Sequence, residues 1–475
     1  MDWIAQLVMK YPGKNGFFTS FSKPEQPSTS RISKDEIVKR RTDLIGSACT
    51  TFYSNDPVHV ESARGQYLYD EDGVQYLDCI SNVQHVGHSH PEVVNAVTEQ
   101  MSKSNCNVRF LSPALVHCAE EIRQTLPKEL NRIYFCNSGS EANDVALRMA
   151  RDFTNGTEVI VLDHAYHGHI ISMMEISPYK FNKPGSRGKP DFVHVAPTPD
   201  VYRGQYRLAD EQINDEAEVE EMGHKYALEV KKIIDRLQSE GKQLAAFYME
   251  SLQSCGGQIM TPPQYLNDVL RYVHEAGGVV VCDEVQTGFG RVGSSFWAFQ
   301  LHAPDAVPDI VTMGKPMGNG FPVSAAAARK EIACSLGRGI QYFNTFGGNP
   351  VAMSACLAVF RVLRREKLQE HALSVGKYFM EKLRQIQIKH ECIGDVRGAG
   401  LFIGIDLVID RRDRRPATEL AAALILKMRQ DHRILINAEG PFDNIIKIKP
   451  PMCFDRDNVD FVVSTMDDVL TELGY

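Results

Sequence analysis

The stretch GGVVVCDEVQTGFGR, residues 277–291, and the stretch MGKPMGNG, residues 313–320, decide the fold of this chain. In the first, the apolar run VVVC ends at Asp283; in the second, the run IVTM, residues 310–313, leads to Lys315. Continuous β-branched runs of this kind are typical of buried parallel strands, and ligands of open α/β sheets bind beyond the carboxyl ends of such strands. We therefore expect an acid and an amine on the same edge of a parallel sheet.

Strands and helices alternate on both sides of these stretches. The strand-like run LAAFYMES, residues 244–251, delivers Glu250, and VIVLDHAYHGH, residues 159–169, delivers Tyr166 and His167. An aromatic ring at such a strand end can lie on a flat cofactor, although simple packing is the commoner role. The alternation predicts an α/β fold with a mostly parallel sheet covered on both faces.

Residues 131–153, NRIYFCNSGSEANDVALRMARDF, combine a strand, a turn of small residues and an apolar-periodic helix. Gly139 and Ser140 stand at the expected amino end of the helix, where backbone N–H groups and the helix dipole favour an anion. This pattern predicts a phosphate site. Ser138 with Glu141 also fits an ordinary capping box, so both interpretations stay open.

The acid Asp283, the amine of Lys315 and the predicted phosphate site together indicate one cofactor. Pyridoxal phosphate (PLP) requires an acid beside its ring nitrogen, a lysine that can form a Schiff base and a site for its phosphate. Taken alone, Asp283 fits a helix cap and Lys315 a solvated loop lysine. Combined with the phosphate site, the two residues predict a PLP enzyme in which both are catalytic.

Composition limits the alternatives. A chain of 475 residues exceeds one ordinary core, and its 43% apolar and 24% charged residues are those of a soluble globular protein. A formal charge of -8 and the lack of a long apolar run give no reason to expect nucleic acid or membrane as partner. The eleven cysteines form no C-x-x-C pair, which predicts free thiols. A small molecule is the expected partner.

The ends of the chain differ from its middle. Residues 1–34 are acid-poor and carry Ser and Pro, which fits either a mitochondrial presequence or an ordinary flexible terminus of a cytoplasmic protein. Residues 35–78 hold a charged helix and a hairpin signal at an Asp-Gly turn, and residues 349–475 alternate helices with a short sheet. We expect these two segments to form a smaller α+β domain beside a large domain of residues 79–348.

A cluster of three histidines and one arginine are weaker candidates for functional residues. His85, His88 and His90 lie close together, but no further Cys or His follows at zinc-ligand spacing, so we expect packing and loop hydrogen bonds and no metal. Arg109 precedes a helix in a short extended piece. A lone arginine is usually a surface charge, and its importance depends on whether it faces the cofactor.

Six motifs, in order, resemble the class III PLP-dependent aminotransferase family: SGSEAN, AYHGH, CDEVQTGFGR, GKPMGNGFP, TFGGNP and RGAGLFIGID. The resemblance implies PLP-dependent transferase fold type I, with a mostly parallel seven-stranded sheet in the large domain. It also implies a homodimer or homotetramer with shared active sites. HVGHSHP, ISPYKF, HVAPTPD, ESLQSCGGQ and KIKPPMCF are similar to the branch of ethanolamine-phosphate and 5-phosphohydroxy-lysine phospho-lyases, which is related to alanine-glyoxylate aminotransferase 2.

The resemblance implies roles for individual residues. Lys315 would hold the cofactor as a Schiff base, Asp283 would pair with the ring nitrogen, Gln286 would bind the ring hydroxyl and Tyr166 would stack on the ring. Thr345 would reach the cofactor phosphate from the neighbouring subunit. The full set of expected cofactor-binding residues is Gly139, Ser140, Tyr166, His167, Glu250, Asp283, Gln286, Lys315 and Thr345.

Two arginines are candidates for the substrate. Arg397, in RGAGLF, corresponds to the arginine that binds a substrate carboxylate in aminotransferases of the family. Arg109 is expected to bind a departing phosphate, because guanidinium matches phosphate with two parallel hydrogen bonds.

The resemblance favours a lyase that removes phosphate and ammonia from ethanolamine phosphate and leaves acetaldehyde. Glu250 is followed by SLQS and not by the Pro-x-Gln-Gly pattern usual in family aminotransferases, which counts against plain transamination. A 5-phosphohydroxy-L-lysine lyase and an aminotransferase of the alanine-glyoxylate type are the alternatives. A phosphate-binding protein without catalysis ranks below all three, because GKPMGNG lacks P-loop spacing.

Overall fold

The computed structural model describes residues 32–301, 303–337 and 340–475. The predicted presequence or flexible segment falls on residues 1–34, nearly all of which lie outside the described residues. Among the helices of the described part, none combines the length and the apolar character that crossing a bilayer requires.

The chain divides into two units, Met1–His59 and Val60–Tyr475. In the first unit, helix α2 (Lys34–Leu44) follows Ser33, whose side chain accepts a hydrogen bond from the backbone N–H of Glu36. This N-cap satisfies one of the N–H groups that the first turn of a helix leaves unpaired.

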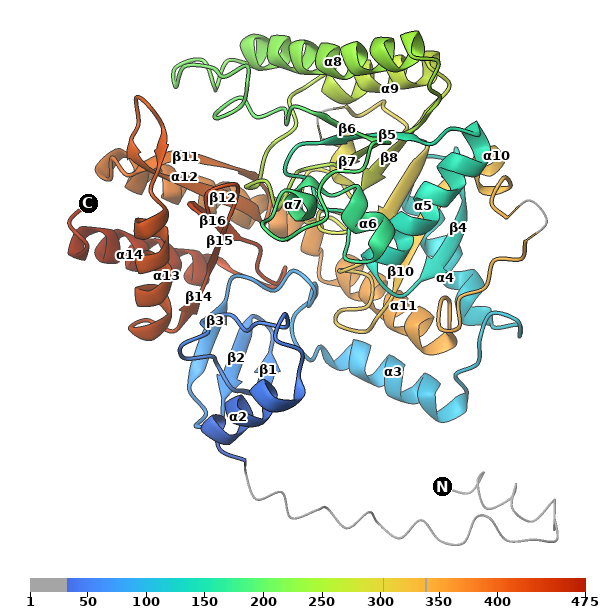
Figure 1. Ribbon diagram of the computed structural model, residues 1–475. Helices are drawn as coiled ribbons and strands as arrows, with labels where there is room; N and C mark the ends of the chain where they lie inside the picture. The colour runs from blue at the N-terminus through green and yellow to red at the C-terminus, as the bar shows by residue number, and fades with distance from the viewer. Residues whose placement is uncertain (1–31, 302, 338–339) are drawn as a thin grey trace, which may run out of the picture. The chain divides into compact units, whose positions relative to one another are not determined.

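The central sheet of the second unit has seven strands (Figure 1). Its strands in spatial order are β4 (Leu130–Cys136), β10 (Ser324–Arg329), β9 (Ile310–Met313), β8 (Val279–Asp283), β7 (Leu244–Glu250), β5 (Glu158–Leu162) and β6 (Val193–Ala196). From β9 to β6 every strand is parallel to its neighbours, while β10 runs antiparallel to β4 and β9. The predicted α/β fold with a mostly parallel sheet is confirmed.

Both faces of this sheet are buried. In β8, Val280 and Cys282 belong to one apolar core and Val281 to the other, because successive side chains of a strand point to opposite faces. Helices cover the two faces as expected for a parallel sheet. They are α5 (Gly139–Thr154) on one face and α8 (Glu216–Ser239), α9 (Tyr265–Glu275) and α11 (Pro350–Arg365) on the other (Figure 1).

Two smaller sheets complete the unit. One has the order β1 (Val60–Arg64), β2 (Tyr67–Asp70), β3 (Gln75–Asp78) and β14 (Ile434–Leu435). The other has the order β11 (Ile393–Ala399), β12 (Phe402–Asp410), β16 (Ile445–Ile448) and β15 (Asn437–Glu439), with β13 (Arg415–Pro416) beside β12. The predicted Asp-Gly hairpin is confirmed, since β2 and β3 are antiparallel about Gly73 at φ 79°. The domain boundaries at residues 78 and 348 stay a prediction.

Proline opens several helices, where its missing N–H costs nothing. Pro91 and Pro350 begin α3 and α11. The helices not yet given are α3 (Pro91–Lys103), α4 (Pro113–Thr125), α6 (Ile171–Glu175), α7 (Pro178–Phe181), α10 (Lys330–Ala333), α12 (Leu368–Lys389), α13 (Thr418–Gln430) and α14 (Arg456–Glu472), with a 3-10 turn at Ala298–Gln300.

The neighbouring histidines have separate partners. His85 bonds through Nε2 to the carbonyl of Phe289 at 2.8 Å, and His88 bonds to Asp78 at 2.7 Å. His90 is the N-cap of α3. Across the described ranges, no group of three or more His, Cys, Asp or Glu side chains is arranged to hold a metal ion.

Candidate active site

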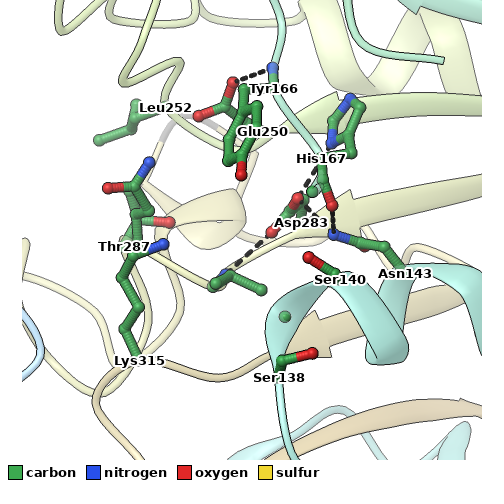
Figure 2. A pocket seen from close by; sticks show the side chains of 14 residues that line it. Ser138, Ser140, Asn143, Tyr166, His167, Glu250, Leu252, Asp283, Thr287 and Lys315 are labelled. Carbon is green, nitrogen blue, oxygen red and sulfur yellow. Dashed lines mark hydrogen bonds and ion pairs between the residues drawn. The ribbon is translucent and has the colours of Figure 1, made fainter. Parts of the chain in front are cut away.

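A cavity of about 230 Å³ lies at the carboxyl edge of the seven-stranded sheet (Figure 2). The neighbouring strands β7 and β8 end in Glu250 and Asp283, and Lys315 follows β9 by two residues. All three side chains line the cavity, together with Tyr166 and His167 from the loop after β5. The structure therefore brings the predicted acid and the predicted amine into one site.

The turn between β4 and α5 forms one wall. Ser138 and Glu141 make the capping box, with Ser138 Oγ accepting from the N–H of Glu141 at 3.2 Å. The box does not exclude a phosphate site, because Gly139 and Ser140 still lie in the first turn of α5, whose N–H groups point away from the helix. A side chain at 139 would place a Cβ 2.7 Å from Val285, so only glycine leaves the backbone accessible there.

Asp283 is held by three donors. His167 Nδ1 and Asn143 Nδ2 donate to Oδ2 at 2.9 and 2.8 Å, and the N–H of Val285 donates to Oδ1 at 3.0 Å. Thr312 in turn donates to Asn143 Oδ1 at 2.7 Å, which fixes the amide so that its NH₂ group faces the carboxylate. These contacts fix the orientation of the carboxylate, with Oδ2 between His167 and Asn143 and Oδ1 on the backbone.

Lys315 lies across the cavity from the helix turn and makes no hydrogen bond to any residue that the structure describes (Figure 2). Burial lowers the pKa of Lys315 from its usual value, although the charges of Asp283 and Glu250 oppose the shift. A lysine that gives up its proton more easily is more often present as the neutral amine, which is the form that acts as a nucleophile and as a base.

Glu250 positions the loop that carries Tyr166. Its carboxylate accepts from the N–H groups of Tyr166 and Ser254, each at 3.0 Å. Burial raises the pKa of Glu250 to about 7, and the nearby charge of Asp283 acts in the same direction. Glu250 therefore contributes to the site by ordering backbone.

The cavity fits PLP on features of this structure. Glycine at 139 and at 168, where a Cβ would lie 2.7 Å from Ser140 Oγ, leaves room for an anion against backbone N–H groups. The carboxylate of Asp283 and the amine of Lys315 face the same space. Gly139, Ser140, Asp283 and Lys315 are thus the residues that would hold the phosphate, the ring nitrogen and the aldehyde.

Arg397 does not line this cavity. It is buried, and its guanidinium donates to Asp395 Oδ2 at 2.7 Å, to Asp406 Oδ2 at 3.3 Å and to the carbonyl of Gly257 at 2.7 Å. Strand register explains the pairing, because Asp395 is two residues away on the same strand and Asp406 pairs with Asp395 across β11 and β12. The guanidinium is already matched by two carboxylates.

Arg109 and Thr345 are exposed and lie outside the cavity of their own chain. The guanidinium of Arg109 lies 3.8 Å from the centre of the Phe343 ring. The segments that carry Arg109 and Thr345 are adjacent, since a Cβ at Gly348 would lie 2.8 Å from Val108.

Asn143 and Lys449 are polar side chains at or beside the site that were not among the predicted residues. Asn143 lies four residues after Gly139 and therefore on the same face of α5, a spacing that marks it as a second side chain pointing to the site. Lys449 Nζ donates to Oε1 of the cavity residue Gln286 at 2.6 Å. Its only sequence signal is a lysine at alternate positions in the apolar strand KIKPP.

A family model for class-III aminotransferases matches residues 51–470. An ethanolamine-phosphate phospho-lyase homolog of Caenorhabditis elegans is 54% identical over 457 residues, which cover 96% of this chain and 97% of that one. A Drosophila melanogaster alanine–glyoxylate aminotransferase 2-like protein is 50% identical, over 94% of this chain and 88% of that one. Human mitochondrial alanine–glyoxylate aminotransferase 2 is 35% identical, over 90% of this chain and 84% of that one.

Solved structures share the fold. A phospholyase from Arthrobacter in complex with phosphoethanolamine is 36% identical, with a TM-score of 0.84 over 92% of this chain and 99% of that chain. An aminotransferase from Bacillus anthracis is 25% identical, with a TM-score of 0.81 over 92% of this chain and 98% of that chain.

Proposed function

Because the chain belongs to the class-III aminotransferase family, whose cofactor is PLP, we propose that it is a phospho-lyase that converts ethanolamine phosphate to acetaldehyde, phosphate and ammonia. The C. elegans relative is named for this activity, and the Arthrobacter relative binds phosphoethanolamine. Every relative described above is named as a phospho-lyase or an aminotransferase, which supports an enzyme that acts on amines.

The observation that favours ethanolamine phosphate as the substrate is that Arg397 is already paired with carboxylates of the protein. In family aminotransferases the corresponding arginine binds the carboxylate of the substrate. Here two carboxylates, Asp395 and Asp406, already engage it, so a substrate carboxylate would have to displace a buried ion pair, which is costly. Ethanolamine phosphate has no carboxylate, whereas 5-phosphohydroxy-lysine and alanine do.

When bound, PLP supplies a ring that takes up the electron pair left on a carbon that loses its proton beside nitrogen. Asp283, oriented by His167, Asn143 and the N–H of Val285, would pair with the protonated ring nitrogen, and Gly139 and Ser140 would hold the cofactor phosphate. Lys315 removes the proton from the substrate carbon next to nitrogen. The bond from the adjacent carbon to oxygen then breaks, phosphate leaves with the electron pair, and water releases acetaldehyde and ammonia.

Product analysis tests the proposal. With ethanolamine phosphate as the only substrate, we expect phosphate and ammonia in equal amounts and no need for a keto acid. With alanine and glyoxylate, we expect amino transfer slower by at least about 100-fold in kcat/KM, because uncompensated burial of a charged group costs several kcal/mol. Keto-acid-dependent amino transfer without phosphate release would instead identify an aminotransferase.

A second copy of the chain is the proposed partner. Val108, Phe110, Leu111 and Phe346 are exposed around Arg109 and Thr345, and Leu111 is fully exposed. Exposed apolar patches of this kind mark interaction surfaces. In a two-fold homodimer, or a homotetramer built from two such dimers, Thr345 and Arg109 would serve the neighbouring active site.

Light scattering tests this arrangement. We expect the wild-type chain of 53.2 kDa to run at twice or four times that mass. Replacing Leu111 with Arg places a charge in the contact and should give monomers with little activity. Ile388→Arg, on an exposed position of α12 outside the patch, is the matched control and should leave mass and activity unchanged. An active wild-type monomer would contradict a shared site.

A mitochondrial location is the last part of the proposal. Two of the relatives, from Arabidopsis thaliana and human, are named mitochondrial. The segment that would carry the signal lies outside the described residues.

A further inference from the structure

Two buried lysines lie near the active site, Lys447 in β16 and Lys449 one residue beyond the end of that strand. Lys447 and Lys449 are separated by Ile448, which points to the opposite face and into the apolar core. Both lysines are buried, with 6% and 3% of their surface exposed. Lysine is almost never buried to this degree unless it is paired.

The charges of these two lysines are not balanced. Lys447 pairs with Glu439 at 2.7 Å. Lys449 donates only to neutral oxygens, Gln286 Oε1 at 2.6 Å and Ser254 Oγ at 3.1 Å, and within the described part of the chain it forms no ion pair. Two lysine amines therefore have one carboxylate partner between them.

These two amines lie close to the reactive amine of Lys315. Gln286, which Lys449 contacts, lines the cavity, and the charges of Lys447 and Lys315 both act on Lys449. Ethanolamine phosphate has only two carbons and an ester oxygen between its nitrogen and its phosphorus. A substrate whose nitrogen occupies the position of the Lys315 amine therefore places its phosphate within the field of the two lysines.

We propose that Lys447 and Lys449 bind the phosphate group of the substrate and stabilise it as it departs, an inference that rests on the proposed function. When the carbon–oxygen bond breaks, its electron pair stays on the phosphate oxygen, so negative charge grows there. Ammonium donors fixed in a buried site bind the departing group more tightly than the ester, which lowers the barrier. Lys449 provides the unmatched charge, and Lys447 adds a second donor shared with Glu439.

The electrostatics of Lys449 agree with this role. Burial, with the neighbouring charges of Lys447 and Lys315, lowers the pKa of Lys449 well below its usual value, and Cys255 and Glu439 only partly oppose the shift. A bound dianion favours the charged form of the amine. Phosphate binding at alkaline pH is therefore expected to take up protons at Lys449.

A purely structural role for Lys449 makes a different prediction. Gln286 Oε1 accepts from both Lys449 and Asn82 Nδ2, which leaves the NH₂ group of Gln286 as the donor toward the cavity. If orienting this amide were the only role of Lys449, its loss would change cofactor affinity and the visible spectrum. The affinity for phosphate would then be unaffected.

The test measures binding to the holoenzyme by calorimetry. The probes are inorganic phosphate and 2-aminoethylphosphonate, in which a carbon–phosphorus bond replaces the ester. For Lys449→Met we expect a dissociation constant raised about 10- to 100-fold for both probes, with cofactor content and visible spectrum unchanged. Glu439→Gln removes the competing carboxylate and should tighten binding several-fold. Lys377→Met, an exposed lysine of α12, is the matched control and should bind as wild type.

The number of protons taken up when phosphate binds also distinguishes a phosphate-binding role of Lys449 from a purely structural one. In buffers of different ionisation enthalpy, wild type should take up protons on binding phosphate at pH 8 to 9. Lys449→Arg keeps the charge and should bind phosphate without this uptake, because arginine is always protonated.

These experiments tell failure of the phosphate-site inference apart from failure of the proposed lyase activity. Wild type that releases phosphate, combined with Lys449→Met that binds both probes normally, would overturn the inference and leave the lyase intact. Loss of cofactor with unchanged phosphate affinity would also overturn it. Weakened phosphate binding in Lys449→Met, in an enzyme that eliminates phosphate from no amine, would support the phosphate site and contradict the lyase.

Discussion

Replacing Lys315 with Ala is expected to reduce phosphate release from ethanolamine phosphate by about 10⁴-fold or more, since the residue is both the attachment point of the cofactor and the base. Lys315 is the amine that lines the cavity opposite Asp283, and it has no hydrogen-bond partner in the described residues that would give it a structural role. The variant should fold normally and lose the visible band that a protein-bound Schiff base gives.

The control is Lys330→Ala. Lys330 is an exposed lysine at the start of α10, fifteen positions further along the chain, and its loss should leave turnover and spectrum unchanged. A small primary amine added to the Lys315→Ala protein should restore part of the activity by acting as the missing base. Full turnover in Lys315→Ala without added amine would show that another group performs the reaction.

The second large effect is expected at Asp283. Replacing it with Asn keeps the size and removes the charge, so the ring nitrogen of the cofactor loses its anionic partner. It also places an NH₂ group or a neutral oxygen against His167 and Asn143, both of which donate to Oδ2. Removal of one fixed electrostatic partner of a reacting group typically costs about 10²- to 10³-fold in kcat.

This prediction has its own readouts. Stopped-flow spectra should show slow proton removal in Asp283→Asn with the cofactor still bound through Lys315. Asp305→Asn, at an exposed aspartate, serves as the control and should behave as wild type. An Asp283→Asn enzyme with a normal rate of proton removal would show that the ring nitrogen needs no anionic partner here.

The sequence alone predicts the parts of this site that depend on local pattern. Apolar runs followed by a polar residue locate Glu250, Asp283 and Lys315 at strand ends, and the parallel topology then brings them to one edge. The turn before α5 carries the predicted capping box of Ser138 and Glu141, and it stays compatible with the predicted phosphate site because glycine at 139 leaves the backbone uncovered.

What depends on pairing between distant strands could not be predicted. Arg397 looks available in the sequence, yet the register of β11 with β12 places Asp406 against it. Lys449 carries no sequence signal beyond its place next to an apolar run, yet the fold buries it beside Gln286, 163 positions earlier in the chain. The role proposed for Arg109 depends on the proposed second subunit, which a single chain does not contain.

The most direct test of the central claim is to reduce the holoenzyme with borohydride and locate the modified lysine by peptide mass spectrometry. We predict one cofactor per chain, attached to Lys315. Attachment to Lys449, the other buried lysine whose pKa is lowered at this site, or to any other lysine would contradict the account.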